Sequence, residues 1–153
     1  ETSQERVEGR REINDLRSKM AQGIKVDPII TVPDIDESSP EFLKDYYRYY
    51  RTGRGFHIRS VNSGLGWNPT TFLSHYSNDI YAYVDEVTQP CLLVHGDLAW
   101  SYNQSVDMMN RLVNVADKEL ITVKGATHCD LYDGGDNNYI PFDKIEEFFN
   151  KNL

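Results

Sequence analysis

The chain has 153 residues, of which 39% are hydrophobic and 26% are charged, and its 16 basic and 24 acidic side chains leave a net charge of −8. This length suits one domain or part of a larger one, and the many aromatic residues argue against a disordered chain. The negative charge disfavours binding to nucleic acid or to anionic membranes, no apolar run approaches the length of a membrane helix, and two cysteines are too few for a disulfide framework.

The first 50 residues predict two helices joined by an extended segment. Thr2 and Glu5 have the spacing of a capping box, so a helix is expected to follow them. Residues 24–40 contain prolines and an acidic stretch, which is typical of an extended connection. Ser38 and Glu41 have the spacing of a second capping box before an aromatic-rich helix. The apolar positions of that helix are Phe42, Leu43, Tyr46, Tyr49 and Tyr50.

A glycine-rich stretch over residues 51–70 is expected to be irregular, and it contains Arg54 and Trp67. Long loops without secondary structure are uncommon inside compact domains unless they are functional. A further helix is predicted over much of residues 71–87. Its apolar positions are Phe72, Tyr76, Ile80, Tyr83, Val84 and Val87.

The organisation changes at residue 89, where strand patterns begin. An apolar run that begins at Cys91 and ends at Gly96 predicts a strand buried on both faces. Residues 119–123 predict a second strand. Both cysteines are interpreted as small buried residues. Two strands separated by a helical pattern form a βαβ unit, so the fold class is α/β with a parallel sheet. We therefore expect residues 1–88 and 89–153 to form two parts.

Two helices accompany these strands. Ser101 and Gln104 have the spacing of a third capping box, which predicts a helix near residues 102–114. Pro141 is expected to open the last helix. The apolar positions of the first helix are Val106, Met109, Leu112, Val113 and Ala116. Those of the last helix are Phe142, Ile145, Phe148 and Phe149.

The loops after the two strands carry the candidate catalytic residues. Functional groups gather at the carboxyl ends of strands in open parallel sheets. Asp97 follows the first strand directly, and His128 lies a few residues beyond the second. An imidazole in that position can reach across the sheet end and take a proton from a nucleophile, although a lone loop histidine is as often structural.

Residues 90–153 resemble the C-terminal part of an α/β-hydrolase, with the strand to Gly96 leading to the acid loop and His128 in the catalytic-histidine loop. The stretch from Gly125 to Asp133 and the stretch from Ile140 to Lys144 resemble a bacterial subgroup of uncharacterised α/β-hydrolases, related to the dienelactone-hydrolase and peptidase-like branches. The resemblance implies that residues 1–88 form a mostly helical lid over the active site. Arg54, Trp67 and Trp100 would then contact the substrate.

The chain departs from this family at two positions. The nucleophile motif G-x-S-x-G is absent, and Ser63 in Asn62-Ser63-Gly64 is interpreted as an ordinary loop serine, so the resemblance implies a nucleophile in a missing N-terminal half. The usual acid position, three residues after Gly96, is Ala99. Asp97 is the candidate acid, with an acid from the missing half as the alternative, and Asp130 is assigned a structural role.

The resemblance predicts part of a serine hydrolase that cleaves a small-molecule ester, thioester or amide, with no metal or organic cofactor. His128 would act as general base and then as general acid. The expected partner of this chain is the missing half or a second copy, and neither nucleic acid nor membrane is expected. A non-enzymatic binding module and a decayed pseudo-hydrolase are the alternatives. The sequence does not fix the cellular compartment of the protein, and the cytoplasm is favoured.

Overall fold

The computed structural model of the chain describes residues 2–153 and divides them into two compact units. The first contains the residues up to Ser39 and Tyr46–Ile80, and the second contains Pro40–Asp45 and Tyr81–Leu153. The expected boundary after residue 88 therefore differs from the observed one. Two stretches expected in the N-terminal part, residues 40–45 and 81–88, belong with the strands.

The first unit begins with α1 (Ser3–Ala21), and its predicted capping box is confirmed. The Glu5 N–H donates to the Thr2 hydroxyl over 3.2 Å, and the Thr2 N–H donates to the Glu5 carboxylate over 2.6 Å. Gly9 lies against the ring of Tyr76, where an added Cβ would come within 2.6 Å of a ring carbon. Among the described residues, no helix has the length and apolarity needed to cross a membrane.

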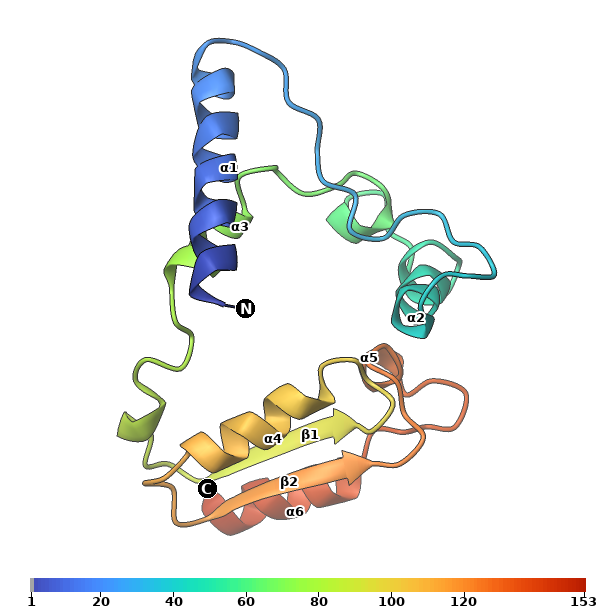
Figure 1. Cartoon of the computed structure of the whole chain (residues 1–153). Coiled ribbons are helices and arrows are strands. Elements are labelled where there is room, and N and C mark those ends of the chain that lie inside the picture. The colour runs from blue at the N-terminus through green and yellow to red at the C-terminus, as the bar shows by residue number, and fades with distance from the viewer. Residues whose placement is uncertain (1) are drawn as a thin grey trace. The chain divides into compact units, whose positions relative to one another are not determined.

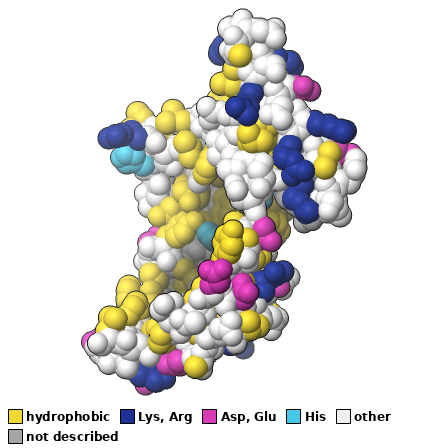
Figure 2. All heavy atoms as spheres, turned by 90° about the vertical axis from the view of Figure 1, so that its left-hand side faces the viewer, with side chains coloured by type: hydrophobic (Ala, Val, Ile, Leu, Met, Phe, Trp, Pro, Cys, Tyr) yellow, Lys and Arg dark blue, Asp and Glu magenta, His cyan; other side chains and the backbone are white. Residues whose placement is uncertain are grey.

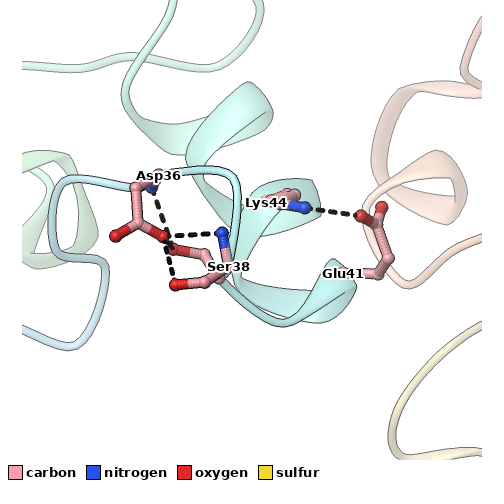
Figure 3. Close-up of polar contacts among 5 residues, drawn as sticks. Asp36, Ser38, Glu41 and Lys44 are labelled. Carbon is pink, nitrogen blue, oxygen red and sulfur yellow. Dashed lines mark hydrogen bonds and ion pairs between the residues drawn. The ribbon is translucent and has the colours of Figure 1, made fainter.

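The aromatic-rich helix is present as α2 (Glu41–Tyr50), but the capping contacts predicted for it differ from those observed. The Ser38 hydroxyl donates to the carboxylate of Asp36 over 2.7 Å, and the Glu41 carboxylate pairs with Lys44 over 3.0 Å (Figure 3). The Ser38 hydroxyl therefore closes a local turn around Asp36. A short 3-10 turn, η1 (Val61–Ser63), lies in the irregular segment that the sequence predicted.

The prediction of a helix over much of residues 71–87 is wrong for the central part of that range. The structure has the short α3 (Phe72–Ser77) and the 3-10 turn η2 (Val84–Glu86). Asn78 ends α3, because its backbone N–H and its side-chain amide both donate to the carbonyl of Ser74, over 3.0 and 2.8 Å.

Two of the apolar residues that suggested a longer helix lie outside any core face. Ile80 is 77% exposed and Tyr83 is 72% exposed. Helical spacing of apolar side chains predicts a helix only where those side chains are buried together. Without that burial, the local asparagine contacts decide where α3 ends.

The second unit contains a two-stranded parallel sheet, as the sequence predicted (Figure 1). Strand β1 (Cys91–Gly96) pairs with β2 (Lys118–Val123) in a register that sets Cys91 opposite Lys118 and Gly96 opposite Val123. Because the strands are parallel and in register, the loops that follow them leave from the same end of the sheet. That end carries the candidate site.

Helix α4 (Tyr102–Arg111) connects the two strands and ends earlier than its apolar stripe suggested. The ammonium group of Lys118 donates to the carbonyls of Met109 and Leu112 over 2.9 and 2.6 Å. These are carbonyls at the C-terminal end of the helix that lack partners within it. Lys118, at the first position of β2, thus ties the end of α4 to the sheet.

Two further helices follow β2: the one-turn α5 (Asp130–Asp133), which the sequence did not predict, and α6 (Phe142–Asn152), which it did. Lys151 of α6 pairs with Asp117 over 2.7 Å, next to the start of β2. Figure 1 shows α4 and α6 on opposite sides of the strands. The buried apolar side chains of this unit are Ala99, Leu112, Val115, Ile121, Ala126 and Cys129.

The second unit also exposes large apolar side chains. Within residues 2–153 the sheet has two strands, so each strand keeps one unpaired edge. Parallel strands are ordinarily buried on both faces, but these strands are mostly half-buried. Hydrophobic side chains reach the surface in Figure 2. The exposed members of this unit include Leu98, Trp100, Val113, Phe142 and Phe149.

Candidate functional site

The site lies where the loops after β1 and β2 meet. The Asp97 N–H donates to the carbonyl of Val123 over 3.1 Å, and the Leu98 N–H donates to the carbonyl of Ala126 over 3.1 Å. Gly96 allows this approach, since an added Cβ would lie 2.2 Å from the Ala126 carbonyl oxygen. The two loops are therefore packed backbone against backbone, as only glycine at this position permits.

Three carboxylates hold the loop that carries His128. Asp97 accepts the Gly125 N–H over 2.7 Å, and Asp130 accepts the Thr127 N–H over 3.0 Å. The third is Asp45 of α2, which is only 7% exposed. It accepts the Thr127 hydroxyl over 2.9 Å and the Cys129 N–H over 3.3 Å, so it binds the residues on both sides of the histidine. Fixed loops of this kind keep a reacting side chain in one orientation.

We expect Asp45→Ala to lower the free energy of unfolding by about 3 kcal/mol, because it leaves a hydroxyl and an N–H without their acceptor in a buried position. The exposed Asp15 of α1 gives a matched control, and Asp15→Ala should change stability by less than about 0.5 kcal/mol. Denaturant titration of both variants measures the difference. Equal losses would show that the buried carboxylate does not support the loop.

His128 lies between two hydroxyl groups. Its Nε2 is 2.7 Å from the Tyr132 hydroxyl, and its Nδ1 is 3.5 Å from the Ser101 hydroxyl. The same Ser101 oxygen is 3.1 Å from Nε2 of His95, a β1 residue whose Nδ1 is 2.5 Å from the Ser105 hydroxyl. The rings of His95 and His128 are 6.5 Å apart. Two imidazoles and three hydroxyls thus form one connected polar cluster.

The predicted capping box at Ser101 is wrong, and this cluster is the reason. Ser101 occupies the N-cap position of α4, but its side chain makes no capping hydrogen bond. A capping serine is worth about 1 kcal/mol to a helix. At this position the hydroxyl faces the two histidines.

Burial lowers the pKa of His95 below its ordinary value of 6.5, and the charge of His128 lowers it further. The folded protein therefore binds the proton of His95 less readily than the unfolded chain does. The contribution of neutral His95 to stability is complete above pH 6.5 and is lost as the pH falls from there through the folded pKa.

We expect the free energy of unfolding to decline as the pH is lowered below 6.5, and to decline less steeply in His95→Gln. The carboxylates with lowered pKa values change the free energy of unfolding only at lower pH, as for Asp36, whose ordinary pKa is 3.8. Denaturant titrations at several pH values measure the slope. A slope that is the same in His95→Gln would contradict the burial argument.

The structure places the predicted site residues in different environments. Asp97 follows β1 at the same sheet end as His128, and its carboxylate binds the Gly125 N–H. Trp100 is 66% exposed and lies 5.6 Å from the ring of Phe42, within the unit that holds His128. Arg54 and Trp67 belong to the other unit.

Those two residues have local partners there. The Arg54 guanidinium lies 5.4 Å from the ring centroid of Tyr49. The indole N–H of Trp67 donates to Asn62 over 2.8 Å. The loop serine Ser63 accepts the backbone N–H of His57 over 3.2 Å. In the described part of the chain, no group of three or more His, Cys, Asp or Glu side chains is arranged to hold a metal ion.

Sequence reasoning missed Asp45, His95, Ser101 and Tyr132 as members of the site. Asp45 is one of several charged residues on an aromatic-rich helix, so no feature of the sequence marked it as a site residue. Ser101 carried a competing signal, because its spacing to Gln104 indicated a helix cap. Tyr132 lies four residues after His128, a spacing that brings side chains together only once a helical turn forms there.

The fold and the cluster define an α/β protein with polar groups gathered at the carboxyl ends of parallel strands. No family model matches the chain. It is 45% identical over 114 residues to the uncharacterized protein PA2218 of Pseudomonas aeruginosa, a match that covers 74% of this chain and 30% of that protein. It is 30% identical over 115 residues to the uncharacterized protein YcjY of Escherichia coli, covering 70% of this chain and 34% of that protein.

A solved structure is also similar. The crystal structure of the hypothetical protein PA2218 from Pseudomonas aeruginosa matches 99% of this chain with a TM-score of 0.82 and 36% sequence identity. The match covers 46% of that chain. The chain thus spans about a third of the length of the curated relatives it matches, and less than half of the solved structure.

Proposed function

We propose that this chain forms part of a serine α/β-hydrolase and supplies its catalytic histidine. The observation that carries the proposal is His128, which follows the second strand of a parallel pair in a loop held by three carboxylates. The intact enzyme would cleave an ester, thioester or amide of a small molecule. The nucleophilic serine would come from a part of the protein outside these 153 residues.

In the proposed reaction the serine attacks the carbonyl carbon while His128 takes the serine proton. The histidine then gives that proton to the leaving group, and water hydrolyses the acyl-enzyme in a second round of the same steps. Backbone N–H groups would bind the oxyanion. The unpaired strand edges and exposed apolar side chains of the second unit support the view that more of a hydrolase core packs against it.

A pseudo-hydrolase is the second candidate, and a specific observation favours it. The usual acid position is occupied by Ala99, which is 6% exposed, and the nearby Asp97 carboxylate is engaged by a backbone N–H. Such a protein would keep the fold and bind a ligand without turnover.

A fluorophosphonate probe, which labels activated serines, tests the proposal. We expect the complete gene product to be labelled at one serine outside residues 1–153, and the isolated 153-residue chain to remain unlabelled. Absence of labelling in a folded complete product would favour the pseudo-hydrolase. Labelling of Ser101 in the isolated chain would place the nucleophile within the chain and contradict the assignment.

A further inference from the structure

The polar cluster around His128 forms a single chain of hydrogen-bonding groups. It runs from the Ser105 hydroxyl to Nδ1 of His95, from Nε2 of His95 to the Ser101 hydroxyl, and from that hydroxyl to Nδ1 of His128. It continues from Nε2 of His128 to the Tyr132 hydroxyl. The longest link is the 3.5 Å between Ser101 and His128, and catalytic hydrogen bonds that are long without substrate often shorten when it binds.

The protons of this chain have two complete arrangements. A neutral imidazole has one donor and one acceptor nitrogen, and a hydroxyl can both donate and accept. In the first arrangement each group donates its proton to its neighbour on the Tyr132 side, so His128 carries its proton on Nε2. In the second arrangement each group donates to its neighbour on the Ser105 side, so His128 and His95 both carry their protons on Nδ1. The tautomers of the two histidines are therefore coupled through Ser101.

Only the second arrangement suits a general base. A base must present an unprotonated Nε2 to the nucleophile, which requires Nδ1–H to be held by an acceptor. Ser101 can accept that N–H if its own proton is donated to Nε2 of His95, and His95 must then be neutral. Burial lowers the pKa of His95, which favours its neutral form, and the charge that His128 acquires when it takes a proton lowers that pKa further.

We propose that Ser101 and His95 are positioning residues that hold His128 in its Nδ1–H tautomer, at the place where serine hydrolases use a carboxylate. The inference rests on the proposed function. A second observation supports it, because Ser101 sits at the N-cap of α4 and yet its hydroxyl makes no capping hydrogen bond and faces the histidines instead. In this arrangement the Tyr132 hydroxyl donates to Nε2, so it must turn away to admit the nucleophile. When His128 then takes the nucleophile proton on Nε2, its Nδ1–H stays donated to Ser101, and no proton moves along the chain.

The experiment is ¹⁵N NMR of histidine-labelled protein at pH 8, where neutral imidazoles dominate. The protonated and unprotonated ring nitrogens give well-separated resonances, so the spectrum of the 153-residue chain reports the tautomer directly. We expect His128 to carry its proton on Nδ1 in the native chain. Ser101→Ala should move the population toward the Nε2–H form that free histidine prefers, and Ser101→Thr should restore the native signal.

His95→Phe tests the coupling itself. This variant keeps a ring at position 95 but removes the acceptor of the Ser101 proton, so Ser101 should turn to donate to His128 and shift it to the Nε2–H form. Ser18→Ala, at an exposed serine of α1 that donates to the carbonyl of Asn14, is the matched control and should leave the His128 signals unchanged. The amide spectrum of each variant confirms that it is folded.

An Nε2–H tautomer in the native chain would overturn the inference. So would His128 signals that stay unchanged in both Ser101→Ala and His95→Phe. These readouts do not depend on hydrolysis, so the failure of this inference is separable from the failure of the proposed function. A coupled tautomer in a protein that no serine probe labels would refute the function alone.

Discussion

Replacing His128 with alanine in the complete gene product is expected to lower the turnover of an activated ester by about 10³-fold or more, because only the oxyanion hole and substrate binding would remain. Steady-state kinetics of the purified protein measures the loss. His57→Ala is a suitable control, since His57 is an exposed residue of the other unit. Full activity in the His128→Ala protein would end the hydrolase proposal for this loop.

The same assay distinguishes whether Asp97 is the catalytic acid or only holds the loop. Its carboxylate accepts one backbone N–H, from Gly125. In Asp97→Asn the amide oxygen can still accept that N–H, so a residue that only holds the loop should keep turnover within about tenfold of the native value. Loss of the acid of a triad costs on the order of 10⁴-fold in turnover. A loss of that size would assign Asp97 as the acid.

Gly96→Ala is expected to have the second large effect, a loss of about 3 kcal/mol in the free energy of unfolding. The added methyl would meet the Ala126 carbonyl oxygen at 2.2 Å and the Thr127 carbonyl oxygen at 2.9 Å. Both contacts are to backbone, so relief requires the histidine loop to move away from β1. We therefore expect the variant to lose activity as well as stability.

The chain offers a matched control for this substitution. Gly53 has no atom within 4 Å of an added Cβ, and its φ is not positive. Gly53→Ala should be neutral, or stabilising by up to about 1 kcal/mol through the unfolded state. Denaturant midpoints of the two variants give the comparison. If Gly96→Ala were as stable as Gly53→Ala, the close packing of the two loops would be contradicted.

Several elements could be predicted from the sequence because the signal and the structure act over the same few residues. The apolar run that ends at Gly96 forms β1, and the capping box at Thr2 opens α1. The order of strand, helix and strand predicted a parallel pair, and the register confirms it. Parallel order alone brings Asp97 and His128 to one end of the sheet, since both follow their strands.

Other features depend on contacts between residues far apart in the chain. Ser101 had the local signal of a helix cap, but its hydroxyl instead contacts two histidines that the fold brings close to it. The contact between Asp45 and Thr127 joins residues 82 positions apart, and no local pattern encodes such a pair.

What the sequence by itself determined is the type of the strands and of the well-capped helices, and the chain position of the candidate base. Those properties follow from backbone preference and from the period of apolar residues. The tertiary structure decided which hydroxyl faces His128, which carboxylates hold its loop, and where α3 stops. A polar side chain has several competing partners of similar energy, and only the folded chain decides which of them comes within hydrogen-bonding distance.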